Sequence, residues 1–292
     1  MQVNFTKLQG SGNDFILVDE WDKVLIAEAD KAAFVKEICQ RHFGVGSDGL
    51  IFVAKSDVAD VNFIFYNPDG SRAEMCGNGI RCLAKYVYEQ GIVAKKEMRV
   101  ETLAGIKSLN LVFKGDSVSE VKVGMGRPQV KRGVAQVTGD PDKTFISQKV
   151  MIHGFEYTIT SVGMGNPHAV LFYENIDGLD VKNIGARIRN HLHVFPNGVN
   201  VHFVELVGIN EFKIRTYERG VEDETLACGT GICASAVASV LTAKATPSKP
   251  IVFNARGGRV KVELDGTTEN ISEAYLIGPA EYVFTGVYTP KL

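Results

Sequence analysis

The sequence predicts two α/β domains of one fold, and three observations lead to this prediction. A cysteine–glycine motif occurs as Met75-Cys76-Gly77-Asn78-Gly79 and again, 152 positions later, as Ala227-Cys228-Gly229-Thr230-Gly231. Gly105 and Gly257 have the same separation, and each lies in the turn of an expected hairpin. Both halves also show the same order of expected strands and helices. A repeat of this length exceeds any solenoid unit, and 292 residues suffice for two cores.

In the first half, apolar spacing predicts two helices. One starts with Asp30 as its cap and ends before Gly44, with Phe34, Val35 and Ile38 on its inner face. The other opens at the Cys76 motif and closes at Gly91. The expected strands cover 15–18, 50–53 and 61–66, followed by a hairpin of 99–102 with 106–113.

The second half repeats this order. A helix is expected around Val181–Ile188, and the helix at 232–243 is rich in Ala and Val nearly all round, which indicates burial on most sides. The expected strands are 201–206 and 212–217, with a hairpin of 251–254 and 259–264.

The domain boundaries follow from a connecting segment and a tail. The stretch 125–148 has the composition of a passage between the halves, and the tail from Ala274 resembles 122–128. We therefore expect one domain of residues 1–126 plus 276–292, carrying Cys76, and a second of residues 127–275, carrying Cys228.

Composition excludes several function classes. A formal net charge of −2 gives no reason to expect nucleic acid as a partner. The first residues lack the apolar core of a signal peptide, and no stretch is apolar enough for a membrane span, so a cytoplasmic protein is expected. The 5 cysteines are odd in number and form no C-x-x-C pair, so we expect free thiols and no metal site.

The two motifs suggest acid–base chemistry by thiols. Glycines let a ligand approach the backbone, and the first N–H groups of a helix bind anions such as a carboxylate. The same field lowers the pKa of a neighbouring thiol from about 8.5. A thiolate Cys76 or Cys228 could remove an α-proton while the other thiol delivers one to the opposite face. Cys39, Cys82 and Cys233 are interpreted as small buried apolar residues.

The chain closely resembles diaminopimelate epimerases along its whole length. The resemblance rests on six motifs in order: Leu8-Gln9-Gly10-Ser11-Gly12-Asn13-Asp14-Phe15, Gly44-Val45-Gly46-Ser47-Asp48-Gly49, the Cys76 motif, Gly165-Asn166-Pro167-His168, Tyr217-Glu218-Arg219-Gly220 and the Cys228 motif. It implies two pseudo-symmetric α+β domains, each a curled, mostly antiparallel sheet around a central helix, with the active site in the cleft between them. It also implies a homodimer and a reaction without cofactor, the interconversion of LL- and meso-diaminopimelate for lysine and peptidoglycan.

The resemblance assigns roles residue by residue. Cys76 and Cys228 would be the two bases, and His168 and Glu218 would adjust their pKa. Backbone N–H groups around Gly77-Asn78 and Gly229-Thr230 would hold the reacting carboxylate. The remaining substrate contacts would come from the polar side chains Asn13, Asn67, Asn166, Asn200, Glu218 and Arg219.

Two departures from the family pattern stand out. Many relatives carry Gln at the position of Gly49, and the segment 221–227 is one residue longer and more acidic than in many of them. We therefore expect Gly49 to lack one side-chain contact of those relatives, and the segment 221–227 to affect the local geometry near Glu218.

Three alternatives are open. A proline or hydroxyproline racemase uses the same two-thiol logic, although its first motif typically has His where Asn78 stands. A non-catalytic amino-acid binder could keep the anion-holding helix ends without needing both cysteines. A thiol oxidoreductase is disfavoured because the thiols belong to separate domains, although a cleft that closes far enough could join them in an inactivating disulfide.

Overall fold

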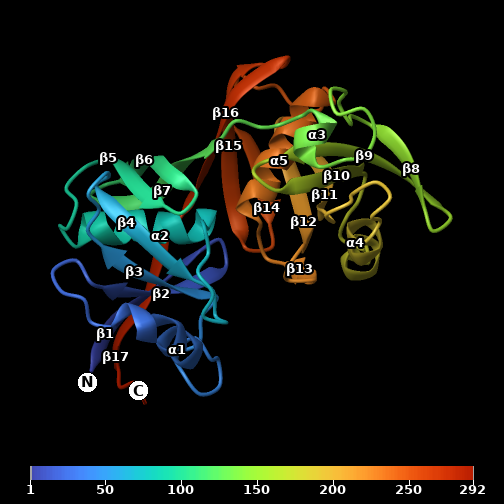
Figure 1. Cartoon of the computed structure of the whole chain (residues 1–292). Helices are drawn as coiled ribbons and strands as arrows, with labels where there is room; N and C mark the ends of the chain where they lie inside the picture. Colours follow the sequence, from blue (N-terminus) through green and yellow to red (C-terminus); the bar gives the residue numbers. More distant parts are fainter. Residues whose placement is uncertain (1, 292) are drawn as a thin grey trace. The chain divides into compact units, whose positions relative to one another are not determined.

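The computed structural model describes residues 2–291, and the chain divides into two compact units. The first comprises Met1–Val123 and Gly278–Leu292, and the second comprises Gly124–Ile277. The chain is α+β, with many strands and few helices, as the fold class predicted from the sequence requires (Figure 1).

In the first unit, β17 and β1 to β7 form a sheet in the order β17-β1-β2-β3-β4-β5-β6-β7. The β2–β3 and β4–β5 pairs are parallel and the other pairs are antiparallel. The strands are β1 (Val3–Gly10), β2 (Asn13–Asp19), β3 (Gly49–Ala54), β4 (Val61–Tyr66), β5 (Glu97–Thr102), β6 (Gly105–Lys114), β7 (Ser117–Gly126) and β17 (Glu281–Tyr288).

Two helices pack on this sheet. Helix α2 (Gly77–Glu89) contacts β1, β2, β3 and β6, so the sheet curls around it (Figure 1). Helix α1 (Glu28–Ile38) covers the other side through a cluster that includes Phe34, Ile16 and Phe52. Its N-cap is Ala27, so Asp30, the cap expected from the sequence, lies inside the first turn.

The second unit repeats this arrangement with the order β8-β9-β10-β11-β12-β14-β15-β16. Its parallel pairs are β10–β11 and β12–β14, at the same two places as in the first sheet. The strands are β8 (Gln148–Ile152), β9 (Phe155–Gly163), β10 (Pro167–Tyr173), β11 (Asn200–Gly208), β12 (Glu211–Glu218), β14 (Ile251–Ala255), β15 (Gly258–Thr267) and β16 (Asn270–Pro279); the short β13 (Asp223–Thr225) adds to β12.

Helix α5 (Gly229–Leu241) occupies the place that α2 holds in the first unit and contacts β9, β10, β11 and β15. It is buried from Gly231 to Val240, which fits its small apolar residues. Helix α4 (Val181–Arg189) packs on the outer cluster around Phe145 and Phe203. The segment expected as a passage carries a single turn of helix, α3 (Arg132–Ala135), within the second unit.

The equal strand order and equal placement of parallel pairs confirm that the sequence repeat is a repeat of fold. No helix in the described residues is long and apolar enough to cross a membrane.

Candidate functional site

Cys76 is the N-cap of α2, the helix enclosed by the first sheet. Its backbone is extended (φ −138°, ψ 117°), and its Sγ accepts a hydrogen bond from the Gly79 N–H at 3.5 Å. Because the helix N-terminus carries partial positive charge, this position favours a negatively charged sulfur. The side chain is half-buried, so a substrate can approach it.

Cys228 holds the same position in the second unit. It is the N-cap of α5 with φ −117° and ψ 108°, and its Sγ lies 3.6 Å from Thr230 Oγ1. Unlike Cys76, it is buried. The structure therefore places both cysteines of the repeated motif at equivalent helix starts.

The other cysteines lie away from these helix starts. Burial raises the pKa of Cys39 to about 12 and that of Cys82 to about 12, so both stay thiols near neutrality. Cys233 is also buried, one turn into α5.

The second glycine of each motif has a packing role that the sequence did not indicate. A Cβ on Gly79 would lie 3.3 Å from the Phe63 ring, and a Cβ on Gly231 would lie 2.1 Å from Cε1 of His202. The interpretation that the glycines let a ligand approach therefore does not account for Gly79 and Gly231. At these two positions a side chain is excluded because core residues, Phe63 and His202, pack against the helix backbone.

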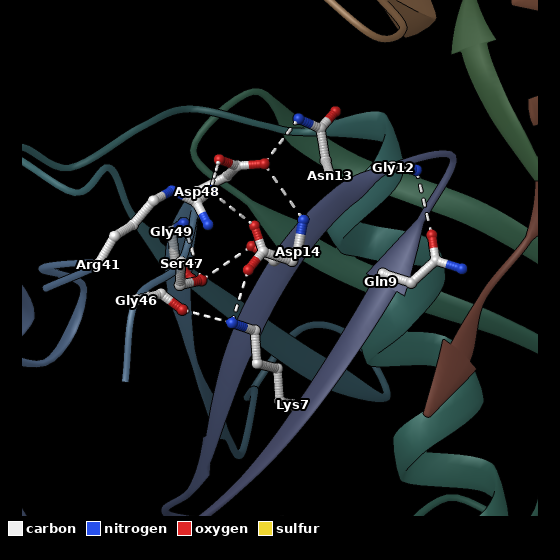
Figure 2. Close-up of polar contacts among 10 residues, drawn as sticks. All are labelled: Lys7, Gln9, Gly12, Asn13, Asp14, Arg41, Gly46, Ser47, Asp48 and Gly49. Carbon is white, nitrogen blue, oxygen red and sulfur yellow. Dashed lines mark hydrogen bonds and ion pairs between the residues drawn. The ribbon is translucent and has the colours of Figure 1, made fainter. Parts of the chain in front are cut away.

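In the first unit, Asn13 and Asn78 form a polar pair beside the Cys76 motif. Asn13 opens β2, and its Oδ1 accepts a hydrogen bond from Asn78 Nδ2 at 2.5 Å. Its own Nδ2 donates to Asp48 Oδ2 at 3.1 Å (Figure 2).

Asp48 and Asp14 belong to an ion-pair network with Arg41 and Lys7 that lies next to Asn13 (Figure 2). Arg41 contacts both carboxylates, and Lys7 contacts Asp14 at 2.6 Å. Burial would raise the pKa of Asp14, but the hydrogen bonds and charges of Lys7 and Arg41 outweigh it and lower that pKa.

Asn67 lies in a turn at the end of β4. Its Nδ2 donates to Ser71 Oγ at 3.0 Å, and its backbone N–H donates to the Ser71 carbonyl at 2.9 Å. The turn explains the presence of an Asn here without any ligand.

Arg81 is a fully buried residue of α2 that sequence reasoning missed. Its guanidinium donates to the carbonyl of Gly77 at 3.1 Å, to Ser11 Oγ at 2.8 Å and to the carbonyl of Pro279 at 3.1 Å. It thereby ties the first turn of α2 to the loop before Asn13. An arginine next to Ile80, in the first turns of an expected helix, was the available signal.

In the second unit, Asn166 and His168 belong to a buried hydrogen-bonded chain. His168 Nε2 lies 2.7 Å from Asn166 Oδ1, His168 Nδ1 lies 2.9 Å from His202 Nε2, and His202 Nδ1 lies 2.9 Å from Thr216 Oγ1. Because burial keeps both rings neutral and Asn166 Oδ1 only accepts, each ring carries its proton on Nε2, and the Thr216 hydroxyl donates. Burial lowers the pKa of His202 to about 3 and that of His168 well below 6.5.

His202 and Thr216 were not predicted, because their contact depends on strand register. They are directly opposite in the antiparallel β11–β12 pair. A histidine at an inward position of an otherwise apolar strand was the only signal in the sequence.

Asn200 and Arg219 lie together at the ends of β11 and β12. Asn200 Oδ1 accepts the backbone N–H of Arg219 at 2.9 Å, and its Nδ2 donates to the Pro167 carbonyl at 3.1 Å. The Arg219 guanidinium donates to the Asn197 carbonyl at 2.9 Å. Asn200 therefore joins the start of β10 to the end of β12.

Glu218 is coupled to Cys228. Burial raises the pKa of Glu218, and the nearby Thr225 and Cys228 side chains oppose this rise. The longer segment after it forms a tight hairpin between β12 and β13, in which Glu222 N donates to the Glu218 carbonyl at 2.8 Å. Glu222, an acidic residue of this segment, accepts hydrogen bonds from the Arg189 guanidinium at 3.0 and 2.9 Å.

Close packing explains why a glycine occupies position 49 in this chain. A Cβ there would lie 2.4 Å from the Phe65 ring and 2.8 Å from the Tyr66 carbonyl oxygen. A side chain at position 49 would require this part of β4 to move.

The described residues contain no group of His, Cys, Asp or Glu side chains arranged to hold a metal ion.

The sequence of the chain is also similar to that of known proteins. The chain matches the diaminopimelate epimerase family over residues 5–131 and 160–283. It is 39% identical to the diaminopimelate epimerase of Alkaliphilus metalliredigens, covering 100% of this chain and 99% of the relative. It is 42% identical to that of Agathobacter rectalis, covering 97% and 98%.

The chain belongs to the diaminopimelate epimerase family.

More distant solved structures share the fold. The Bacillus anthracis phenazine biosynthesis protein of the PhzF family superposes with a TM-score of 0.70 at 16% identity, covering 99% of this chain and all of the other. A hydroxyproline epimerase from Agrobacterium vitis gives 0.67 at 15% identity, covering 98% and 91%. At such identities the likeness concerns the fold alone, which is the α+β fold expected from the sequence.

Proposed function

We infer that the protein is a diaminopimelate epimerase, an isomerase that interconverts LL- and meso-diaminopimelate. Membership of the family at about 40% identity over the full chain carries this conclusion. The placement of Cys76 and Cys228 as N-caps of α2 and α5 supports it, because the reaction needs two groups that exchange a proton with one carbon.

We propose that Cys76 and Cys228 are the two bases. One acts as thiolate and removes the α-proton, and its S–H bond forms as the C–H bond breaks. The electron pair stays on the α-carbon and its carboxylate, stabilised by the N–H groups of Gly77-Asn78 and Gly229-Thr230. The other cysteine, a thiol, then gives its proton to the opposite face and is left as thiolate.

The neighbouring residues have supporting roles in this proposal. Glu218 and His168 adjust the proton affinity of the thiols, with Glu218 acting through its contact with Cys228. Asn13, Asn67, Asn166, Asn200 and Arg219 bind the ammonium and carboxylate groups of diaminopimelate, and no cofactor takes part. The family resemblance also supports proposing a cytoplasmic homodimer of two-domain subunits, whose mass light scattering would test.

Deuterium incorporation tests the function directly. In D2O, the protein should introduce deuterium at the α-carbon of LL-diaminopimelate while forming the meso isomer, and it should leave L-proline unlabelled. Labelling of proline alone would instead identify a proline racemase. Binding of diaminopimelate without labelling would identify a non-catalytic binder.

Two variants and one control test the assignment of the bases. Cys76→Ala and Cys228→Ala should each lose epimerisation by at least a thousandfold, because one face of the carbon then lacks its proton carrier. Cys233→Ala, in the same helix as Cys228, should keep it. Unchanged turnover in Cys76→Ala would rule out the two-base mechanism.

A further inference from the structure

Four side chains of the first unit form a chain of hydrogen bonds that leads from the surface to the start of α2. Asn78 Nδ2 donates to Asn13 Oδ1 at 2.5 Å, and Asn13 Nδ2 donates to Asp48 Oδ2 at 3.1 Å. Arg41 donates to Asp48 Oδ1 at 2.5 Å (Figure 2). Asn78 itself is buried in the first turn of α2, two residues after Cys76.

The Asp48 carboxylate determines which end of each asparagine amide donates and which end accepts in this series of hydrogen bonds. An ionised carboxylate only accepts hydrogen bonds, whereas a side-chain amide can donate from one end and accept at the other. Asp48 Oδ2 also accepts the Asp14 backbone N–H at 3.2 Å, so this oxygen faces two donors. Asn13 must therefore turn Nδ2 toward Asp48 and Oδ1 toward Asn78, and Asn78 must turn its Nδ2 toward Asn13.

Arg41 keeps Asp48 in this orientation. The same guanidinium nitrogen contacts Asp14 Oδ1 at 3.0 Å, and Asp14 is held in turn by Lys7 at 2.6 Å. The Arg41 side chain is 57% exposed, so its ion pairs contribute little to the free energy of unfolding. Their effect is to fix the direction in which the carboxylate points.

We propose that Asp48 and Arg41 are positioning residues that set the direction of the Asn13 and Asn78 amides for substrate recognition. In this direction Asn78 offers its Oδ1 as an acceptor, and Asn13 offers its second Nδ2–H as a donor. This pairing suits the ammonium and carboxylate groups of an amino acid. The proposal rests on the proposed function, in which Asn13 and Asn78 belong to the substrate site.

Replacing the Asp48 carboxylate by an amide of the same shape should reverse the donor-to-acceptor direction of these hydrogen bonds. In Asp48→Asn, the charged Arg41 attracts the remaining oxygen more strongly than the Asp14 N–H does, so the new NH₂ group faces Asn13 and the Asp14 N–H loses its acceptor. Asn13 must then turn its Oδ1 toward position 48, and Asn78 must turn its own oxygen toward Asn13. Both asparagines would offer the wrong end to the substrate.

Removing Arg41 from that variant should restore the original direction. In Arg41→Met/Asp48→Asn, the oxygen of the new amide at position 48 is free to accept from Asn13 and from the Asp14 N–H, and its NH₂ group can donate to Asp14 Oδ1. We expect kcat/KM for diaminopimelate to fall about tenfold in Asp48→Asn, the effect of about one lost hydrogen bond. We expect it to fall only two- to threefold in Arg41→Met and to the same extent in the double variant.

A purely structural ion pair would give a different order. The double variant would then be at least as impaired as Asp48→Asn, and this result would overturn the proposal. If Asp48→Asn fails to fold, the double variant is compared with Arg41→Met alone: activities within threefold support the proposal, and a further tenfold loss contradicts it. Melting temperatures identify variants that fail to fold.

A measurement without substrate separates this proposal from the proposed function. The side-chain NH₂ signals of Asn13 in a ¹⁵N–¹H spectrum, assigned by their loss in Asn13→Ala, should shift in Asp48→Asn and return toward wild type in the double variant. Unmoved signals in Asp48→Asn would overturn the fixed direction. If the wild-type protein labels no diaminopimelate, the proposed function fails, and these signals still decide whether the carboxylate sets the direction of the amides.

Discussion

At the scale of single residues, the two motif cysteines combine a structural and a chemical task. Cys76 accepts the Gly79 N–H and so caps α2 with its sulfur, while the proposed mechanism requires the same sulfur to carry a proton. Oxygen caps a helix better than sulfur does, but a hydroxyl does not ionise near neutrality. The two tasks can therefore be separated by substitution.

Cys76→Ser and Cys76→Ala should both lose epimerase activity and should differ in stability. Ser is among the preferred N-cap residues, and replacing a polar cap by Ala costs about 1 kcal/mol. We expect the Ser variant to exceed the Ala variant by about 1 kcal/mol in the free energy of unfolding, measured by urea denaturation. Equal stabilities would show that the Cys76 side chain has no capping role.

The buried histidine pair predicts a dependence of stability on pH. The folded-state pKa of His202, about 3, lies below the ordinary value of 6.5, and that of His168 is lowered in the same direction. The unfolded chain then binds more protons below pH 6.5, so each histidine's contribution to stability is fully present above that pH and declines as pH falls, for His202 down to about pH 3. The slope is about 1.4 kcal/mol per pH unit for each histidine.

His202→Gln should reduce that slope. Gln can still hydrogen-bond His168 but does not titrate, so one of the two contributions disappears. Between pH 6 and 4.5, the free energy of unfolding of the variant should fall less steeply than that of wild type by about 1.4 kcal/mol per pH unit. Urea titrations of both proteins at several pH values measure this difference, and parallel curves would mean that His202 titrates normally in the fold.

Several of these residues could be predicted from the sequence because local pattern determines them. Cys76 and Cys228 sit next to glycines at the start of apolar helical spacing, and this pattern alone locates a helix N-terminus. His202 and Asp48 could not be assigned in the same way. Their partners, Thr216 and Asn13, are brought to them by strand pairing between distant segments.

At the scale of elements, the Cys-Gly motifs show how closely each central helix approaches its sheet. The sequence predicted both helices, with the second expected at 232–243 where α5 is Gly229–Leu241, but it could not indicate what surrounds them. In α2, Gly79 packs against the Phe63 and Phe15 side chains. In α5, Gly231 packs against the hydrogen-bonded ring of His202. These neighbouring residues determine how much the free energy of unfolding would fall if either glycine carried a side chain.

Gly231→Ala should therefore be far more damaging than Gly79→Ala. The new methyl group would lie 2.1–2.8 Å from three atoms of the His202 ring, which two hydrogen bonds hold in place. Overpacking of this kind costs about 1–3 kcal/mol, and we expect the upper end of that range. At Gly79 the nearest contacts are 3.3–3.4 Å, and Ala gains up to about 1 kcal/mol in helix propensity, so the net change should be small.

Urea denaturation of the two variants checks this asymmetry. The pair is its own control, because both substitutions add one methyl group at the same position of equivalent helices. Equal losses of stability would contradict the packing described for His202.

Strands were less completely predicted than helices. Apolar runs predict β2, β3 and β4, whereas β1, β9 and β10 are not among the strands expected from the sequence. In β1 the buried positions include Lys7, whose charge is paired with Asp14 of β2, and this breaks the apolar alternation. Such pairing is a tertiary event that local sequence does not reveal.

At the scale of the whole molecule, the repeat visible in the sequence corresponds to two sheets with the same order and the same parallel pairs. The two sheets differ in how their first strand is obtained. In the second unit β8 directly precedes β9, whereas in the first unit the equivalent partner of β1 is β17, from the end of the chain. The sheet of the first unit therefore includes a strand that follows the whole second unit in the sequence.

Removing β17 should destabilise the first unit selectively. Truncation after Pro279 removes the β1–β17 pairing, the Phe5–Phe284 contact and the Phe34–Tyr288 contact. Because β8–β16 keep their partners, we expect amides of β1 and β2 to exchange with deuterium much faster while those of β10–β12 stay protected. Removing only residues 291 and 292 is the matched control and should leave both regions protected. Uniform loss of protection in both units would instead mean that the chain unfolds as one cooperative body.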